Sequence, residues 1–371
     1  MRGGLACLGN NILDTVTQNA YNDWSVPSES GNQINKAGEI LSDRKKRASV
    51  SEFEWAWDLT GRWRACHAYP INTFQSTLRT KTRDFSGAPI VAQRLKRMPT
   101  IIDKLRRYPS MQLTQMQDIA GVRAVLNSVS QVRELANDYR NNTAFDHRLR
   151  NVKDYISEPR DMDGYRSIHL IYEYKNNRNH AYDGLILEVQ MRSKLQHIWA
   201  TAVETMGTFL GQALKSRQGE KAWLDFFAIT SSAFALMEHC PSVPRFEDLS
   251  LKQTFQAVKA SETALGALER MRGFSAAVNE IVKTGTARFY HVVVLDSLQK
   301  TVEIYPYDRD SFKEALSAVS KFEEKAAKGE KIEPVLVSAG PLDQLRRAYP
   351  NFFLDIRAFD QMVKTILNKA A

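Results

Sequence analysis

Polar residues of types that can act in catalysis lie at the start of one predicted strand and along one face of another. Asp118 precedes an apolar run, where a carboxylate is costly unless it holds a metal or a hydrogen-bond donor. Counting by two puts Asp118 and Arg123 on opposite faces, so they serve one site only if Asp118 lies at the strand end. The same counting aligns Glu188, Gln190 and Arg192 on one face. Such a row suits an active-site strand; a solvent-facing strand is the alternative, which the apolar flank LILEV disfavours.

A cluster of cations precedes these strands. Residues 94–107 (RLKRMPTIIDKLRR) contain six Lys or Arg side chains and one acid, Asp103. Arg94, Lys96 and Lys104 could bind a polyphosphate, since Arg supplies a planar fork and Lys a point charge. On a helix the cations cannot all share one face, and taken alone this segment fits a solvated surface helix better.

The segment DGYRSIH, residues 163–169, offers an aromatic ring beside cations. Tyr165 follows a glycine at a strand entrance, where its ring could stack on a base or simply cap the core, and both interpretations are equally supported. Arg166 and His169 follow toward the same strand entrance. His169 alternates away from the apolar residues beside it, so its pattern is not that of a core residue.

A mixed sheet with a crossover helix would position these residues. Between residues 118 and 192, strand-like segments are separated by one stretch with helical periodicity, which indicates the α/β or α+β class. The expected strands cover residues 118–126, 147–156, 166–174 and 185–192, and the expected helix covers residues 128–142.

The remainder of the chain divides into a helical part and a second sheet. Two helical stretches separated by prolines are expected between residue 193 and about residue 283. After them, the pattern predicts two strands, an amphipathic helix ending at Gly329, a third strand and a mostly helical end. We therefore expect domains over residues 1–283 and 284–371.

Length and composition limit the possible classes of protein. A chain of 371 residues fits two or three domains. Its three scattered cysteines argue against a disulfide scaffold or a cysteine-built zinc site and favour the reducing cytosol. No apolar run is long enough to span a bilayer and no signal peptide is readable, so we expect a cytoplasmic protein without a membrane partner. A net charge of +9 suits a protein that handles nucleotides or nucleic acids.

Four segments resemble, in order, the motifs of the RelA/SpoT-type small alarmone synthetase family. They are RLKRMPTIIDKL, DIAGVR, KDYI followed by DGYRSIH, and EVQMRSKLQHIWA, within residues 84–238. The resemblance implies an α+β, nucleotidyltransferase-like mixed sheet with flanking helices. It also implies a pyrophosphokinase that uses Mg²⁺ to move the terminal pyrophosphate of ATP to a ribose 3′-hydroxyl. The chain departs from the family in having Gln93 before Arg94, and it shows no HD…ED cluster of an alarmone hydrolase.

The resemblance also assigns roles to individual residues. Asp118 would hold Mg²⁺, while Glu188 would assist the metal or take the proton of the attacking hydroxyl. Tyr165 would stack on the acceptor base and join Asp118 and Glu188 as a catalytic residue. The remaining assignments are adenine binding by Arg94 and Arg123, triphosphate binding by Lys96 and Lys104, and an acceptor pocket of Tyr165, Arg166, His169 and Gln190.

Within the family, the chain most resembles fused toxin–antitoxin (CapRel-type) phage-defence proteins. This resemblance rests on QHIWATAVETMG, LKSRQGEKAWLDFF and the appended small domain. It implies a toxin that transfers pyrophosphate to the 3′ end of tRNA and that is triggered by a phage structural protein such as capsid. The C-terminal α/β domain would be zinc-finger-like without zinc and would block the ATP site with Tyr349 and Phe352, although Phe352 by itself fits a core residue better. The alternatives are an alarmone synthetase acting on GDP or GTP, and a non-catalytic nucleotide or phage-protein sensor.

Overall fold

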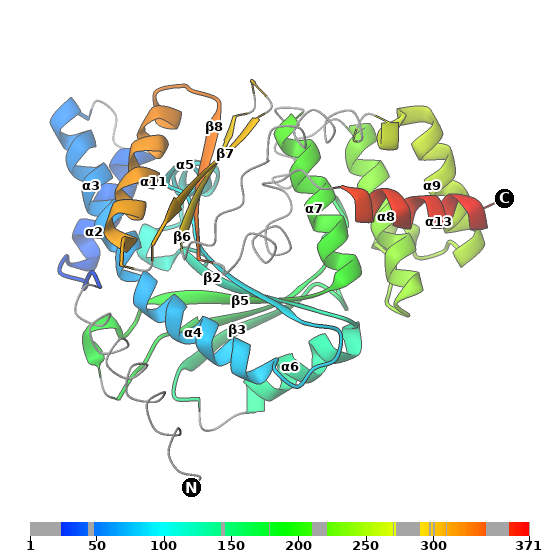
Figure 1. Cartoon of the computed structure of the whole chain (residues 1–371), viewed down its shortest axis with the longest axis horizontal. Coiled ribbons are helices and arrows are strands. Elements are labelled where there is room, and N and C mark those ends of the chain that lie inside the picture. The colour runs from blue at the N-terminus through cyan, green and yellow to red at the C-terminus, as the bar shows by residue number, and fades with distance from the viewer. Residues whose placement is uncertain are drawn as a thin grey trace, which may run out of the picture.

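The computed structural model places most of the chain in two sheets and their surrounding helices (Figure 1). The residues that it describes are 24–43, 48–141, 145–177, 179–209, 221–269, 271, 290–296, 298–299, 301–308, 310–338 and 356–370.

Three helices precede the first sheet: α2 (Gly31–Leu41), α3 (Val50–Cys66) and α4 (Ala68–Lys81). The first two begin at capping boxes, because the hydroxyls of Ser30 and Ser49 each accept a backbone hydrogen bond from the third residue of the helix. Helices α2 and α3 enclose a small apolar core with α5 (Met98–Arg107). Helix α5 is thereby held at the end of the first strand.

The first sheet is mixed and has five strands in the order β1-β2-β5-β4-β3. Only the central β2–β5 pair is parallel, and the other three pairs are antiparallel. This confirms the expected mixed sheet and α+β class. The strands are β1 (Ile90–Leu95), β2 (Ala120–Leu126), β3 (Arg148–Asp154), β4 (Ile168–Glu173) and β5 (Ile186–Ser193).

The two faces of this sheet differ in chemistry. Apolar side chains such as Val122, Leu170 and Val189 pack on one face against α4 and α6 (Val129–Asn141), which supply Phe74 and Leu135 among others. Figure 1 shows both helices below the sheet. The alternate residues of β2 and β5 therefore point to the opposite face, where the polar residues of the motifs gather.

A helical layer follows the first sheet. Helix α7 (Lys194–Phe209) continues directly from β5, and α8 (Lys221–Met237) packs against α7 and α9 (Leu251–Leu265). The C-terminal helix α13 (Arg357–Lys369) joins this layer, shown at the right of Figure 1.

The second sheet is antiparallel, with the order β7-β6-β8. It contains β6 (Tyr290–Asp296), β7 (Thr301–Tyr307) and β8 (Ile332–Ser338), and α11 (Phe312–Ala327) packs on it. We call residues 290–338 the ββαβ unit. This unit contacts α5 and β1, whereas α13 packs elsewhere. The predicted boundary after residue 283 falls among residues that the structure does not describe.

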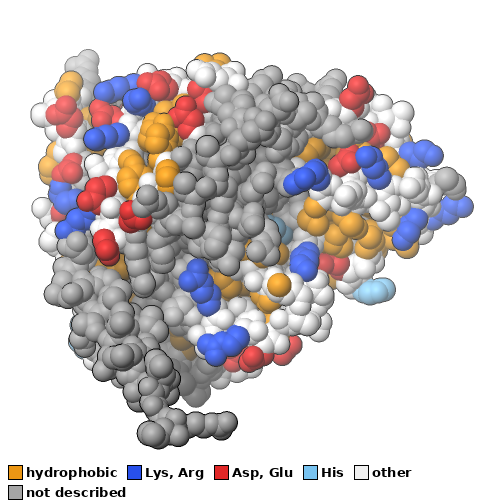
Figure 2. All heavy atoms as spheres, viewed as in Figure 1, with side chains coloured by type: hydrophobic (Ala, Val, Ile, Leu, Met, Phe, Trp, Pro, Cys, Tyr) orange, Lys and Arg blue, Asp and Glu red, His pale blue; other side chains and the backbone are white. Residues whose placement is uncertain are grey.

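One local prediction is corrected by the structure. The segment from Arg94 to Arg107 is not a single helix, because Arg94 belongs to β1 and the helix begins at Met98, with proline at its second position. Among the residues that the structure describes, no helix combines the length and apolarity needed to span a bilayer. On the face shown in Figure 2, cationic and anionic side chains are interspersed over α11 and the N-terminal helices rather than separated by sign.

Candidate active site

Strand register brings the polar residues of four motifs into two cross-strand rows. One row contains Arg94, Gly121 and Glu188, which are direct partners across β1, β2 and β5. The neighbouring row contains Arg123, Gln190 and His169, paired across β2, β5 and β4. Because the central β2–β5 pair is parallel and in register, segments separated by more than sixty residues in sequence share one surface.

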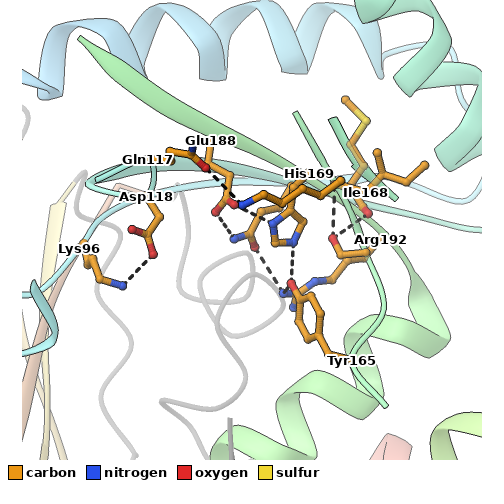
Figure 3. A network of polar contacts seen from close by, with 12 residues as sticks. Lys96, Gln117, Asp118, Tyr165, Ile168, His169, Glu188 and Arg192 are labelled. Atoms are coloured by element: carbon orange, nitrogen blue, oxygen red, sulfur yellow. Dashed lines mark hydrogen bonds and ion pairs between the residues drawn. The ribbon is translucent and has the colours of Figure 1, made fainter. Parts of the chain in front are cut away.

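A pocket lies over these rows. It encloses about 410 Å³, its open mouth included, and it is lined by both carboxylates that the sequence singled out. The lining residues are Ala92, Arg94, Asp118, Gly121, Val122, Arg123, Glu188 and Gln190. Asp118 precedes the first residue of β2, so it escapes the alternation that would have placed it opposite Arg123. The predicted convergence of Asp118 and Glu188 is therefore found (Figure 3).

Asp118 is held between two lysines. Its Oδ2 lies 2.9 Å from Lys96 Nζ and its Oδ1 lies 2.8 Å from Lys104 Nζ. Burial opposes ionisation of this carboxyl, but the two ammonium charges outweigh it and lower the pKa of Asp118 far below its usual range. Burial also opposes the charged form of Lys96 and so lowers its pKa, and the Asp118 charge partly offsets this effect. Two cations suited to phosphate thus converge on the carboxylate predicted to bind metal.

Glu188 is held by its neighbours on the sheet. His169 Nδ1 lies 2.6 Å from Glu188 Oε1, and Gln190 Nε2 donates to Glu188 Oε2 at 2.6 Å. Burial favours the neutral acid, but the His169 charge and these hydrogen bonds outweigh it and lower the pKa of Glu188 to about 2. The carboxylate therefore stays ionised near neutral pH, as a proton acceptor must.

His169 connects Glu188 to Tyr165. The Tyr165 hydroxyl lies 2.7 Å from His169 Nε2 and accepts a hydrogen bond from Arg192 Nη2 at 2.6 Å (Figure 3). Burial opposes ionisation of the phenol, but Arg192 and His169 lower the pKa of Tyr165 to about 7. We call Tyr165, His169 and Glu188 the relay, because each shares a hydrogen bond with the next.

The Tyr165 ring itself is covered. The side chain is 7% exposed, and the Arg160 guanidinium lies 4.3 Å from the ring centroid. A base that stacks on this face of the ring has to displace Arg160. The stacking role inferred for Tyr165 stays a prediction, while its hydroxyl takes part in the relay.

Arg166 lies apart from the relay. It is buried, its Nε donates to Ser231 Oγ on α8, and burial lowers the pKa of its guanidinium to about 10. The structure therefore joins Arg166 to the helical layer, while His169 and Gln190, the other residues predicted near the acceptor, surround Glu188. Tyr349 and Phe352, predicted to be autoinhibitory, lie outside the described residues.

Arg192 was aligned with Glu188 and Gln190 by the sequence but was assigned no role, yet it contacts two of the predicted site residues. Besides Tyr165, it donates to Gln190 Oε1 at 3.3 Å. The signal was present in the sequence, because Arg192 alternates in phase with Glu188 and Gln190.

The two pocket carboxylates suit a magnesium ion that substrate phosphates help to hold. Mg²⁺ in phosphate-transfer sites commonly takes one or two protein carboxylates and completes its shell with phosphate and water. Asp118 and Glu188 supply that number, and Asp118 is the more accessible, with 27% of its side chain exposed. Within the described residues, no group of three or more His, Cys, Asp or Glu side chains is arranged to hold a metal alone.

Comparison with known proteins finds a match over the part of the chain that forms the pocket. Residues 93–207 match the family model for a region found in RelA / SpoT proteins. This range contains all the pocket and relay residues except Ala92. Residues 93–207 are thus similar to this region of RelA / SpoT proteins.

Curated relatives are similar over about a third of this chain. The GTP pyrophosphokinase YjbM of Bacillus subtilis (strain 168) is 32% identical over 123 residues, which is 32% of this chain and 56% of that protein. The GTP pyrophosphokinase YwaC of the same organism is 33% identical over 113 residues, covering 29% and 52% respectively. The chain thus spans about half the length of these relatives.

Solved structures overlap more loosely. The small alarmone synthetase 1 of Bacillus subtilis bound to pppGpp matches with 23% identity and a TM-score of 0.38, over 47% of this chain and 93% of that one. A GTP pyrophosphokinase family protein of Streptococcus pneumoniae matches with 21% identity and a TM-score of 0.39, over 58% and 98%.

Proposed function

We propose that the chain is an ATP-dependent pyrophosphotransferase whose active site is the pocket between Asp118 and Glu188. The observation that carries this proposal is the convergence on one pocket of two carboxylates and two arginines, with Lys96 and Lys104 bound to one carboxylate. The names of the two relatives, both GTP pyrophosphokinases, support the same reaction class.

In the proposed reaction, the 3′-oxygen of an acceptor ribose attacks the β-phosphorus of ATP. The bond from that phosphorus to the oxygen bridging it to the α-phosphorus breaks, AMP leaves, and the pyrophosphoryl group stays on the 3′-oxygen. Glu188 takes the hydroxyl proton, and His169 stabilises the ionised carboxylate at 2.6 Å. Arg94 and Arg123 hold adenine, while Lys96 and Lys104 turn from Asp118 to the phosphates.

Asp118 would hold the magnesium ion, and Glu188 would assist the metal if it does not take the hydroxyl proton. When bound, the ion would neutralise phosphate charge that two lysines alone leave uncompensated. Positioning and charge supply most of the rate enhancement in transfers of this kind, since there is little covalent work for the protein.

The proposed acceptor is the 3′ end of tRNA, which would make the protein a growth-arresting toxin. The net charge of +9 supports a polyanionic acceptor, because cationic proteins bind phosphate backbones irrespective of sequence. A second candidate acceptor, GDP or GTP, is favoured by the names of the relatives.

The C-terminal part would keep this toxin inactive. We propose that it is a zinc-finger-like unit without zinc, that Tyr349 and Phe352 occupy the ATP site at rest, and that a phage structural protein such as capsid relieves the block. Contact of the ββαβ unit with β1 and α5, which carry Arg94 and Lys104, supports regulation from this side.

One transfer assay tests the proposal and separates its alternatives. Full-length protein carrying Tyr349→Ala is given Mg²⁺ and ATP labelled in the γ-phosphate, with tRNA, GDP or GTP as acceptor. We expect label at the 3′ end of tRNA, and no label in the matched variant that also carries Glu188→Gln. Label in GDP or GTP alone would identify an alarmone synthetase. No label in any acceptor, with a phage capsid protein also supplied, would contradict the enzymatic proposal and leave a nucleotide or phage-protein sensor.

A further inference from the structure

A buried carboxylate from the ββαβ unit reaches the turn that carries Lys96. Glu323 on α11 is fully buried, and its Oε1 accepts a hydrogen bond from the backbone N–H of Met98 at 2.9 Å. Met98 is the first residue of α5, and Arg97 before it provides no side-chain cap. Glu323 therefore caps α5 from a segment more than two hundred residues away, where the helix dipole favours a negative charge.

The other oxygen of Glu323 fixes the same turn by a second route. Glu323 Oε2 lies 3.5 Å from Arg64 Nη1, and Arg64 Nε donates to the backbone carbonyl of Lys96 at 2.7 Å. Both peptide groups that flank Arg97 are thus held through one carboxylate. Arg64 is 4% exposed, so neither charge of this pair is solvated, and each depends on the other.

This turn determines where the phosphate-binding lysines lie. Lys96 is part of it, and Lys104 lies on α5, whose first turn Glu323 caps. Both amines bind Asp118 at the pocket, at 2.9 and 2.8 Å. A continuous set of contacts therefore leads from α11 through Glu323 to the two lysines.

We propose that Glu323 is a positioning residue for the ATP site, so that this site is complete only while α11 is docked. This inference rests on the proposed function, and it extends it. The ββαβ unit would contribute to ATP binding, and relief of inhibition would have to move residues 349–352 without withdrawing α11. A partner that pulled α11 away would weaken ATP binding instead of activating the enzyme.

The test compares full-length Glu323→Ala and Glu323→Gln with Glu324→Ala. The matched control, Glu324, is the next residue on α11 but is 58% exposed and pairs with Lys328. The first measurement is amide hydrogen exchange over residues 96–105 without nucleotide, which does not require that the protein be an enzyme. The second is affinity for a non-hydrolysable ATP analogue with Mg²⁺. Arg64→Met breaks the same pair from α3 and leaves α11 unaltered.

We expect Glu323→Ala and Arg64→Met to speed exchange over residues 96–105 and to weaken analogue binding by about ten-fold or more, since small displacements of positioning groups carry effects up to about a hundred-fold. Glu323→Gln retains an acceptor for Met98 and should lie in between. Glu324→Ala should match the unaltered protein. If exchange at residues 96–105 is unchanged in Glu323→Ala and in Arg64→Met, the inference is wrong, whether or not α11 stays docked. Faster exchange in a protein that fails to transfer pyrophosphate would uphold it and refute only the proposed reaction.

Discussion

Glu188 on β5 and His169 on the antiparallel neighbour β4 are diagonal neighbours, with the carboxylate Oε1 2.6 Å from the imidazole Nδ1. Glu188 raises the pKa of His169 against the opposing effect of burial, and His169 lowers that of Glu188. Each residue therefore favours the charged form of the other, in a place where an isolated charge would be unfavourable. This mutual dependence makes the pair sensitive to pH.

We expect the pair to make stability depend on pH on both sides of neutrality. A histidine whose pKa is raised by folding stabilises the protein fully below its unfolded pKa, near 6.5, and this contribution is lost as pH rises through the raised value. The Glu188 contribution is present above pH 4.5 and is lost as pH falls toward about 2. The Tyr165 phenol, whose pKa is lowered to about 7, contributes stability that rises with pH over the same range. Urea unfolding from pH 5 to 9 should therefore show the alkaline loss in Tyr165→Phe, where this opposing contribution is removed, but not in Tyr165→Phe/His169→Asn. The same alkaline slope in both proteins would assign it to another group.

The relay predicts different results for two substitutions of Tyr165. Tyr165→Phe keeps the ring but removes the hydroxyl that contacts His169 and Arg192, so we expect a loss of transfer rate of about 10²-fold or more if the relay carries a proton. If Tyr165 serves only to stack on the acceptor base, Tyr165→Phe should be nearly as active as the unaltered protein and only Tyr165→Ala inactive. Tyrosinate absorbance gives an independent check, since a phenol titrating near pH 7 should be present in the unaltered protein and absent from Tyr165→Phe.

The arrangement around Asp118 predicts that Lys104 matters for ATP binding and Arg106 does not. Lys104→Ala removes one of the two ammonium groups on Asp118, and we expect the dissociation constant for an ATP analogue to rise by roughly ten-fold. Arg106→Ala is the control on the same helix, because Arg106 is exposed and pairs with Asp43 away from the pocket. Equal losses in both variants would indicate a general effect of charge.

A larger residue in place of Gly121 provides a steric test of the pocket. A Cβ added at this residue meets only the Glu188 carbonyl oxygen, at an ordinary 3.7 Å, so the backbone tolerates a side chain. The added group would lie between Arg94 and Glu188 in the row that forms the pocket floor. Gly121→Val should therefore abolish analogue binding while the melting temperature changes little. Retained binding would place the nucleotide elsewhere.

Substitution of Gly164 should reduce stability, whereas substitution of Gly121 should reduce binding. The Gly164 φ of +77° disfavours other residues, and an added Cβ would lie 2.7 Å from Ser231 Cβ. Gly164→Ala is expected to destabilise the protein by about 1–3 kcal/mol or more, measured by urea unfolding. Gly184→Ala provides a control for the backbone term, because its φ is +86° but no atom lies within 4 Å of an added Cβ. Equal losses in the two variants would mean that contact with α8 contributes nothing.

The sequence predicted the local parts of this site better than their surroundings. The strands carrying Asp118, His169 and Glu188 follow from period-two alternation, and the sheet brings them together as expected. The break between Arg94 and Met98 was missed because a dense run of cations hides the change from strand to helix. Glu323 had no recognisable signal, since one acid in an amphipathic helix looks like any solvated residue until its burial against Arg64 is known.

Helix α13 closes the helical layer on the side remote from the ββαβ unit. Phe359 is 1% exposed and its ring packs within 6.2 Å, centroid to centroid, of Phe226, Phe227 and Phe234. In chain order, the ββαβ unit therefore lies between α9 and α13, which both belong to the helical layer.

In topological terms, the ββαβ unit is an insertion within the helical layer, to which the chain joins it at both ends. Connection at both ends raises the effective concentration of the ββαβ unit at the ATP site, so even weak docking would be maintained. Cutting the chain after residue 283 would remove the ββαβ unit but would also remove α13, and with it the buried Phe359, from the helical layer. Point substitutions in the intact chain are therefore the means of separating loss of regulation from loss of the scaffold.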